Sequence, residues 1–340
     1  MDLNASTNST SNDKWPQGTE AIIISVILIV IFTIALIGNF PVVFMTYWEK
    51  KLHTSTNILI ANLAFCDLLI TIFIIPICFI VVQVGMWPFS SITCQILGFL
   101  EMVSYTASLS SLAMISINRY YAIVRALDQD FAKKMSVKRA KYMIAIVWIY
   151  SLVWASPPLY GWNRYSFVLG KLMCNMDHRE GQYPLLATIF CTLLPSTILF
   201  YCTIRIIVYM WQNFTNRSIN LTRSNRLERR VTIMMGIIAI VYFLCIGPNL
   251  LMATVVRFNE YSGSLHLYYR IQAIATILYF SNSAWNSIIY GAMNSYLRHI
   301  VQQKLLTNIC CRCRSDRHSS TVIPLSVRFR SKRANSHLML

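Results

Sequence analysis

Two acidic residues stand inside long apolar stretches, where a charge is costly to bury. Asp67 lies within residues 62–69, Asn-Leu-Ala-Phe-Cys-Asp-Leu-Leu, and Glu101 lies seven residues after Cys94. A charged side chain at mid-bilayer costs roughly 2.5–3.5 kcal/mol on insertion scales, so it usually marks a functional site. The chain has no His-Glu-x-x-His motif, no Gly-x-Ser-x-Gly motif and no pair of intramembrane acids at catalytic spacing. The sequence therefore predicts binding rather than catalysis, and the protein is not expected to be an enzyme.

The side chain of Asp67 must face the interior of a helix bundle, because lipid offers it no partner. Polar residues expected at a similar depth are Asn39, Ser108, Asn282, Ser283 and Asn286. One carboxylate among hydroxyl and amide oxygens can form a site for a small cation. It can equally form a water-filled hydrogen-bond network, and the sequence leaves both interpretations open.

Glu101 is expected in the outer third of the bundle, about two turns inside its helix. Ser108 lies seven residues further on, near the same helix face. A lone carboxylate in this position can hold a ligand cation, pair with a base of the protein, or stay protonated and donate a hydrogen bond. We expect a ligand pocket lined by Glu101, Tyr105, Thr188, Asn249 and Tyr279.

Helices must position these side chains, and the composition indicates helices that cross a membrane. Of the 340 residues, 56% are hydrophobic and 13% are charged, which is about half the charged share of a soluble protein. A spanning helix needs roughly 20 mostly apolar residues. Seven stretches qualify: residues 21–47, 56–82, 94–124, 140–160, 184–210, 231–256 and 267–291. Lipid forces backbone polar groups to pair within the chain, so each stretch is predicted to be a helix, whereas the short alternating segments of a β-barrel are absent.

The predicted fold class is therefore all-α. A seven-transmembrane helix bundle is expected over residues 21–291, after an extracellular and glycosylated N-terminus over residues 1–20. A short amphipathic helix over residues 292–309 is expected on the membrane surface, followed by a disordered cytoplasmic tail over residues 310–340. A kink is expected at each mid-helix proline, namely Pro76, Pro195 and Pro248.

The formal net charge of +17 invites a nucleic-acid interpretation, but its distribution argues against one. With the N-terminus outside, 22 of the 30 Lys and Arg residues fall in the cytoplasmic connections and tail, and six fall in the outer segments. This positive-inside bias predicts a multi-pass protein of the plasma membrane, with its C-terminus in the cytoplasm and lipids as partners. Asn4 and Asn8 stand in sequons of the outer N-terminus and are predicted glycosylation sites.

The ten cysteines divide by topology into three groups. Five lie inside helices, where they are expected to be small core residues. Cys94 and Cys174 are the two on the outer side, where the compartment is oxidising, so a disulfide between them is predicted. The remaining three follow the amphipathic stretch and are expected to be palmitoylated, the alternative being reduced thiols: Cys310, Cys311 and Cys313.

Charged residues also stand at the inner ends of two predicted helices. Arg119 lies in the triplet Asn118-Arg119-Tyr120, and Glu228 precedes the helix over residues 231–256. An ion pair between Arg119 and Glu228 would hold the inner end of that sixth helix inward. The alternative is two interfacial charges that extend to water.

These residues together resemble the pattern of a rhodopsin-like (class A) G-protein-coupled receptor over roughly residues 21–305. The landmarks in chain order are Gly38-Asn39, residues 63–67, Trp87, Cys94, Asn118-Arg119-Tyr120, Trp148, Cys174, Pro195, residues 245–248 and residues 286–290. Each landmark is weak alone, but their joint occurrence in this order is specific.

The resemblance implies a receptor that transduces an extracellular small-molecule signal to a heterotrimeric G protein by outward movement of helix 6. It assigns G-protein coupling and switching to Asn118, Arg119, Tyr120, Glu228, Asn286 and Tyr290. It assigns an allosteric sodium ion to Asp67, Ser108, Asn282 and Asn286 and implies no covalent cofactor. Arrestin and receptor kinases are further partners that the resemblance implies.

Four positions depart from the family pattern. The acid expected before Arg119 is Asn118, so a restraint on the arginine is missing and basal signalling is predicted. The proline expected in the helix 7 motif is Ser287, and the tryptophan expected two residues before Pro248 is Ile246. The tyrosine expected in helix 5 is Thr203.

The features leave the subfamily open among three groups. Residues 156–165 resemble an opsin segment, but Phe280 stands where opsins carry the lysine that binds retinal, so covalent retinal binding is not expected. The triplet Asn118-Arg119-Tyr120 and the helix 7 motif without proline resemble melatonin receptors. Glu101 takes the place of the aspartate of amine receptors. One alternative is an opsin-related receptor that has lost covalent retinal binding; a transporter or channel is a second, although no internal repeat occurs.

Overall fold

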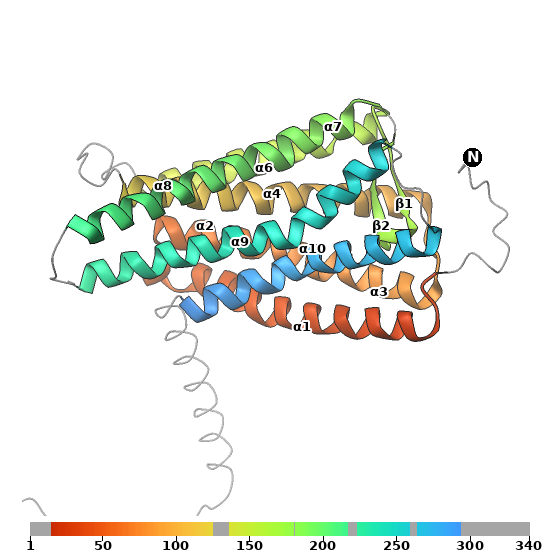
Figure 1. Cartoon of the computed structure of the whole chain (residues 1–340), viewed down its shortest axis with the longest axis horizontal. Helices are drawn as coiled ribbons and strands as arrows, with labels where there is room; N and C mark the ends of the chain where they lie inside the picture. Colours follow the sequence, from red (N-terminus) through yellow and green to blue (C-terminus); the bar gives the residue numbers. More distant parts are fainter. Residues whose placement is uncertain (1–14, 125–135, 180, 217–222, 259–263, 294–340) are drawn as a thin grey trace, which may run out of the picture. The chain divides into compact units, whose positions relative to one another are not determined.

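The computed structural model describes residues 15–124, 136–179, 181–216, 223–258 and 264–293, all within the first of two compact units, Met1–Arg298. The long helices are α1 (Gly18–Trp48), α2 (Ser55–Leu69), α3 (Ile75–Val84), α4 (Ser91–Ile123), α6 (Val137–Ala155), α8 (Leu194–Asn216), α9 (Arg223–Phe258) and α10 (Leu265–Met293) (Figure 1). The shorter elements are η1 (Lys50–Leu52), η2 (Ile70–Ile74), η3 (Pro157–Tyr160), β1 (Tyr165–Val168), η4 (Leu169–Lys171), β2 (Met173–Met176), α7 (Tyr183–Ala187) and η5 (Thr188–Leu193).

Two of the predicted spans contain a π-helical turn that ends two residues before the proline of that span. The turn η2 joins α2 to α3 and is followed by Pro76, and η5 joins α7 to α8 and is followed by Pro195. Proline lacks the backbone N–H that would continue the regular ladder, so a wider turn with shifted hydrogen bonds accommodates it. Pro248 instead lies inside α9 without a break in the helix.

When α2 with α3, and α7 with α8, are each counted as one pass, the described residues form seven helical passes, as the sequence predicts. Among the described residues, six of the passes are long and apolar enough to cross a membrane. The seventh, α10, has 29 residues, and its lower hydropathy comes with a buried face that carries six polar residues: Gln272, Thr276, Asn282, Ser283, Asn286 and Ser287. Helix α1 begins three residues before its predicted span, and helix α9 begins eight residues before its own. Polar residues extend both helices beyond their apolar stretches.

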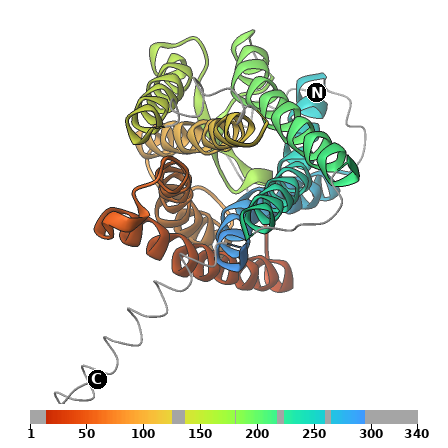
Figure 2. The same ribbon diagram turned by 90° about the vertical axis from the view of Figure 1, so that its left-hand side faces the viewer.

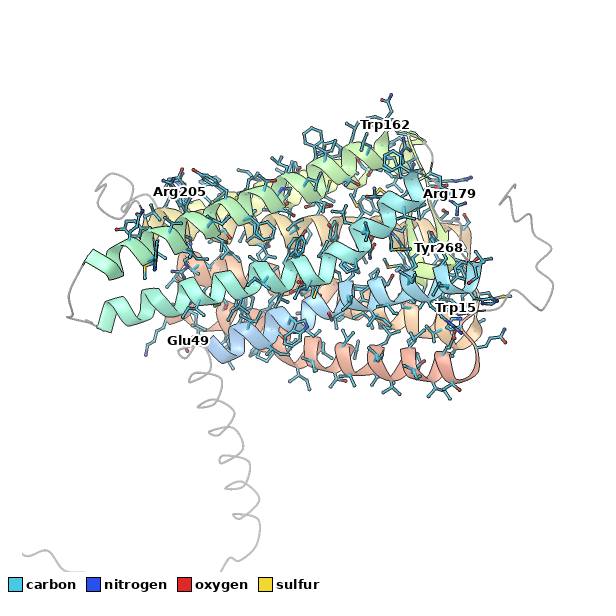
Figure 3. The ribbon with its side chains drawn as sticks, viewed as in Figure 1. Trp15, Glu49, Trp162, Arg179, Arg205 and Tyr268 are labelled. Atoms are coloured by element: carbon cyan, nitrogen blue, oxygen red, sulfur yellow. A yellow bond between two sulfur atoms is a disulfide. The ribbon has the colours of Figure 1, made fainter. Side chains whose placement is uncertain are left out.

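The helices surround α4, which packs against α2, α6 and α8 (Figure 2). Large apolar side chains of the other helices are exposed, among them Ile22, Ile149 and Phe243. Figure 3 shows side chains projecting outward along these helices. A water-soluble protein rarely exposes apolar surface on this scale, whereas a bilayer covers it.

Polar side chains connect the helices inside the bundle. The side-chain amide of Asn62 in α2 donates to Ser111 Oγ of α4 at 2.8 Å, and Trp148 Nε1 of α6 donates to Asn62 Oδ1 at 2.9 Å. Asn39 Nδ2 of α1 donates to the backbone oxygen of Ser283 in α10 at 3.1 Å. Because each of these groups would be costly to bury alone, they fix which helices are neighbours.

A two-stranded antiparallel sheet lies at one end of the bundle, which we call the outer end; the opposite end, which carries Arg119, is the inner end. In this sheet Tyr165 pairs with Met176 and Val168 with Met173. These strands are not predictable from the sequence, because four residues each are too few for a pattern of alternating polarity. The sheet is a small addition to an otherwise helical fold.

The predicted ends of the chain lie mainly outside the described residues. Of the N-terminal region over residues 1–20, the structure describes Trp15 onward, and α1 begins at Gly18. Of the predicted surface helix over residues 292–309, only the last two residues of α10 are described. The predicted tail over residues 310–340 lies entirely outside the description.

The contact between α1 and α10 depends on a glycine. A Cβ added to Gly38 would overlap the side chain of Ser287, the residue that stands where the resemblance leads one to expect a proline. Ser287 Oγ donates to the backbone oxygen of Ala284 at 2.8 Å, so its position is fixed. The two helices therefore approach as closely as they do because residue 38 has no side chain.

Replacing Gly38 by Ala is expected to lower the stability of the protein by about 1–3 kcal/mol, the usual cost of overpacking. The measurement is the thermal unfolding midpoint of the detergent-solubilised protein. Adding Ser287→Gly should restore most of the loss, because it removes the overlapping side chain. The control is Gly247→Ala, where an added Cβ meets nothing within 4 Å. An equal loss of stability in both single variants would contradict the close contact.

Candidate functional site

The β1–β2 hairpin covers the outer end of the bundle and is anchored at three points. The predicted disulfide is present: Cys174 in β2 is bonded to Cys94 near the start of α4. Tyr165 OH donates to the backbone oxygen of Ala155 at 2.7 Å, and the ring of Tyr165 lies against Gly98. These anchors hold the residues of β2 above the helix that carries Glu101.

Glu101 is buried, and both of its carboxylate oxygens accept a hydrogen bond. Tyr279 OH of α10 donates to Oε1 at 2.8 Å, and Asn175 Nδ2 of β2 donates to Oε2 at 3.1 Å. Of the roles considered for this acid, pairing with a protein base is not seen, since among the described residues no Lys or Arg nitrogen lies within ion-pair distance of it. A carboxylate has about four acceptor positions, so capacity for a further donor remains.

A second polar group, formed by Lys171 and His178, lies in the loop above Glu101. Lys171 Nζ is 3.1 Å from Asn175 Oδ1 and 3.3 Å from His178 Nε2. Burial lowers the pKa of Lys171 to about 8, and the charge of Glu101 partly offsets the effect. Burial, together with the positive charges of Lys171 and Arg257, holds the pKa of His178 well below its usual value. His178 is therefore neutral at pH 7.

These groups line one cavity, which we call the Glu101 cavity. It measures about 560 Å³ including its opening to solvent. All five residues predicted to bind a ligand line it: Glu101, Tyr105, Thr188, Asn249 and Tyr279. They come from α4, η5, α9 and α10, so the structure brings together side chains that are up to 178 positions apart in the chain.

The outer loop also contributes side chains that the sequence did not predict for this cavity. Lys171, Asn175 and His178 line it, together with Met173 and Met176 of the hairpin. One signal for them exists, because a disulfide at Cys174 must draw its neighbours over the start of α4. Which of these neighbours point inward depends on the pleat of β2, and the sequence does not fix it.

The polar residues expected around Asp67 also gather. Ser108 Oγ and Ser283 Oγ each donate to Asp67 Oδ1 at 3.2 Å, and Asn286 Nδ2 donates to Oδ2 at 3.0 Å. Asn282 lines the same cavity, which we call the Asp67 cavity, and its buried Oδ1 has no hydrogen-bond partner among the described residues. Asn39 is the exception, since its amide bonds the backbone of α10 instead.

This donor set fits a small hard cation. Two carboxylate oxygens, two hydroxyls and the unpaired amide oxygen of Asn282 are oxygen ligands of the kind such ions prefer. Asn286 presents its amide nitrogen to Asp67 and so acts as a donor here rather than a ligand. Within the described ranges, no group of three or more His, Cys, Asp or Glu side chains could hold a metal ion.

Three residues line both the Glu101 cavity and the Asp67 cavity: Tyr105, Ile246 and Tyr279. Ile246 is buried in α9 at the position of the family's tryptophan. Phe280, at the position of the retinal lysine, is 1% exposed and its ring lies 5.2 Å from that of Tyr279. Phe280 thus fills space in the core, and an amine that could bind retinal is absent at this position.

The residues predicted for coupling fall into separate groups at the inner half. Asn118 Nδ2 donates to Thr56 Oγ1 of α2 at 3.0 Å, so it does not restrain the arginine that follows it. Arg119 Nε is buried without a hydrogen-bond partner among the described residues, and the Tyr120 ring packs against Tyr121. Tyr290 is buried, with a hydroxyl that lacks a partner in the described part of the chain.

Several predicted residues lie outside the description. The side chain of Glu228 is one of them, so the Arg119–Glu228 pair stays a prediction. The same holds for the glycosylation sites Asn4 and Asn8 and for the palmitoylation sites Cys310, Cys311 and Cys313.

Comparison with known proteins agrees with this arrangement. The profile of the 7 transmembrane receptor (rhodopsin family) matches residues 38–290. Galanin receptor 2a of Danio rerio is 28% identical over 82% of this chain and 77% of its own length. Melanopsin of Podarcis siculus is 27% identical over 81% of this chain and 60% of its own length. The crystal structure of squid rhodopsin is similar in fold, with a TM-score of 0.71 at 23% identity over 91% of this chain and 94% of that one.

The relatives carry names as different as galanin receptor and melanopsin, so they identify the family and leave the subfamily open. The profile spans most of the chain, from α1 to the end of the α10 motif. The chain therefore belongs to the rhodopsin family of seven-transmembrane receptors, and it is a multi-pass membrane protein that signals as a G-protein-coupled receptor.

Proposed function

We propose that the receptor binds an extracellular small molecule in the Glu101 cavity and responds by moving the inner end of α9 outward. The observation that carries this proposal is the convergence of five predicted residues from four helical elements on one cavity beneath a disulfide-anchored hairpin. A ligand that binds one arrangement of the helices better than the other shifts the population between them. Heterotrimeric G protein would then bind at the inner end, beside Arg119.

Glu101 is the proposed anchor for a ligand group that donates hydrogen bonds, such as a protonated amine. Its partners Tyr279 and Asn175 hold the carboxylate in one position without neutralising its charge. Lys171 lies on the far side of Asn175, so the cavity carries opposite charges at two places. Such a cavity favours a polar ligand with a donor group at one end.

The proposed route from ligand to inner face uses tyrosines, because the family's tryptophan is Ile246. Tyr105 and Tyr279 border both cavities, and Tyr105 OH bonds Thr192 Oγ1 of η5 at 2.9 Å. One turn inward on α9, Tyr242 OH lies 3.1 Å from Ser196 Oγ of α8. Displacing Tyr105 or Ile246 would thus change the contact between α8 and α9, which must open if α9 is to move.

The proposed orientation has the hairpin outside the cell and Arg119 facing the cytoplasm, in the plasma membrane. It rests on the positive-inside distribution of Lys and Arg and on a disulfide that needs an oxidising compartment. Arrestin, receptor kinases and lipids are proposed as further partners. A nucleic acid is not proposed as a partner. An opsin-related origin with loss of retinal binding fits Phe280, whereas a transporter or channel has no observation in its favour.

Replacing Glu101 by Gln is expected to lower the potency of a donor-bearing agonist by roughly tenfold or more, because a hydrogen bond to a charged acceptor is lost. The measurement is agonist-dependent nucleotide exchange on a G protein, with a panel of indoleamines, monoamines, peptides, lipids and retinoids. Tyr279→Phe should give a smaller loss, because it removes only one partner of the carboxylate. If every active ligand keeps its potency in the Glu101 variant, Glu101 is not the anchor.

Sodium is proposed to bind at Asp67 and to stabilise the arrangement described here against the active one. Exchanging sodium for an organic cation at equal ionic strength should then raise agonist affinity by about fivefold. Asp67→Asn should abolish this response, because it removes the charge that attracts the ion. Ser281→Ala is the matched control, since Ser281 lies on α10 but bonds Leu278 and Cys245 instead. A sodium response retained in the Asp67 variant would contradict the site.

Basal signalling is expected because Asn118 bonds Thr56 and gives Arg119 no ionic restraint. Asn118→Asp should lower basal nucleotide exchange by about two- to fivefold, since a carboxylate beside Arg119 can pair with it. Ile117→Val is the control on the same helix. Basal exchange equal to that of membranes from cells with empty vector would contradict the predicted basal signalling.

A further inference from the structure

A membrane-facing groove runs along the outer half of α9, and we call it the lateral groove. One wall carries Leu185 of α7 with Ile189 and Leu193 of η5, and the other carries Leu250, Ala253 and Phe258 of α9. The groove measures about 700 Å³ including its open side. Two backbone features lie beside it: the π-helical turn η5 on one wall and Pro248 at the inner end of the other. Such turns shift side chains out of regular register, so the two helices do not close on each other.

The open side of the lateral groove faces lipid rather than water. Leu185, Ile189, Leu193 and Phe258 are 50%, 39%, 45% and 64% exposed, and all are large apolar side chains. Leu185, Ile189 and Leu193 belong to one span that is long and apolar enough to cross a membrane, and Phe258 belongs to another. An apolar chain lying in the groove would therefore exchange with the bilayer.

The lateral groove adjoins the Glu101 cavity. Four residues line both spaces: His178, Thr188, Leu250 and Ala253. Figure 1 shows the outer end of α9 turning toward α7, where these residues come together. A molecule in the groove would thus lie against the wall that the groove shares with the cavity.

The outer end of the groove is positively charged. Arg257 of α9 lines it and is half-buried, and Arg257 Nη1 donates to the backbone oxygen of Arg179 at 3.2 Å (Figure 3 labels Arg179 beside this end of α9). Lys171 lies behind His178, with Lys171 Nζ 3.3 Å from His178 Nε2. Burial first, and then the charges of Lys171 and Arg257, lower the pKa of His178. In the described part of the chain, the two ion pairs are Arg164–Asp177 and Arg270–Glu20, so the charge of Arg257 is not neutralised by a carboxylate there.

We propose that the lateral groove binds an anionic amphiphile taken from the outer leaflet, with its carboxylate or phosphate beside Arg257 and His178 and its hydrocarbon chain against Leu185, Ile189 and Leu193. The chemistry is complementary at both ends, since a guanidinium binds such head groups through charge-assisted hydrogen bonds and the walls are apolar. The proposal rests on the proposed function for its orientation and for the cavity as a ligand site.

The test uses the full-length receptor in phosphatidylcholine nanodiscs and two photoreactive probes. One is a monoacyl phosphate with a diazirine in its chain, and the other carries the same chain on a phosphocholine head. The expected result is labelling on α7, η5 and the outer half of α9, with a preference of at least tenfold for the phosphate probe. Equal labelling by both probes, or labelling spread over all lipid-facing helices, would overturn the proposal in favour of ordinary bilayer lipid.

Matched variants separate the groove from the surrounding surface. Arg257→Gln should lower labelling by the phosphate probe roughly tenfold and leave the phosphocholine probe unchanged. The control for charge is Arg270→Gln, whose guanidinium pairs with Glu20 at a different helix. Thr254→Trp should block the groove, whereas Leu251→Trp, on the same helix but not lining the groove, should not. Labelling that survives both Arg257→Gln and Thr254→Trp would overturn the proposal.

A further variant distinguishes failure of this proposal from failure of the proposed function. Glu101→Gln should keep full labelling of the groove, because Glu101 does not line it. Loss of the groove signal with an intact effect of Glu101 on agonist potency would overturn the groove alone. Specific labelling with no effect of Glu101 on any agonist would overturn the Glu101 anchor and leave the groove standing.

Discussion

The bundle depends on one constraint, which is that lipid cannot satisfy a polar group. Each buried polar side chain must therefore find its partner on a neighbouring helix. The side-chain amide of Asn62 joins α2 to α4 and α6, and that of Asn39 joins α1 to α10. Asp67 and Glu101 each collect donors from separate elements. The same contacts that satisfy these groups thus determine the order of the helices and create the two central cavities.

The sequence predicts much of the fold because hydropathy and lipid leave few choices. Seven apolar stretches correspond to the seven helical passes of the described residues, and the cysteines on the outer side give the disulfide between Cys94 and Cys174. The depth of Asp67 in its helix is enough to name most of its partners, since residues at equal depth meet in a bundle. The β1–β2 hairpin and the π turns were not predicted, because they depend on local backbone register rather than on composition.

The candidate site is predictable only in its helical part. Glu101 and Tyr279 are polar residues in apolar helices, so the sequence identifies them as candidate site residues. Lys171 and His178 lie in a loop, where polar residues are common. Their importance comes from burial, which the sequence does not show, and burial also lowers the pKa values of both groups. The lateral groove was missed for a related reason: each of its residues suits a lipid-facing helix, and only the gap between α7–η5 and α9 makes them a site.

With the inner end in the cytoplasm, as proposed, the hydrogen bond between Asn118 and Thr56 has a consequence for how this end responds to the cell. An amide neither gains nor loses a proton in the physiological range, so the contact between α4 and α2 has the same strength in an acidified cell as in a resting one. An acid in this position would instead exchange protons with the cytosol and make the resting state weaken as the cytosol acidifies. In the proposed orientation, the contact between Asn118 and Thr56 is thus insensitive to changes in cytosolic pH.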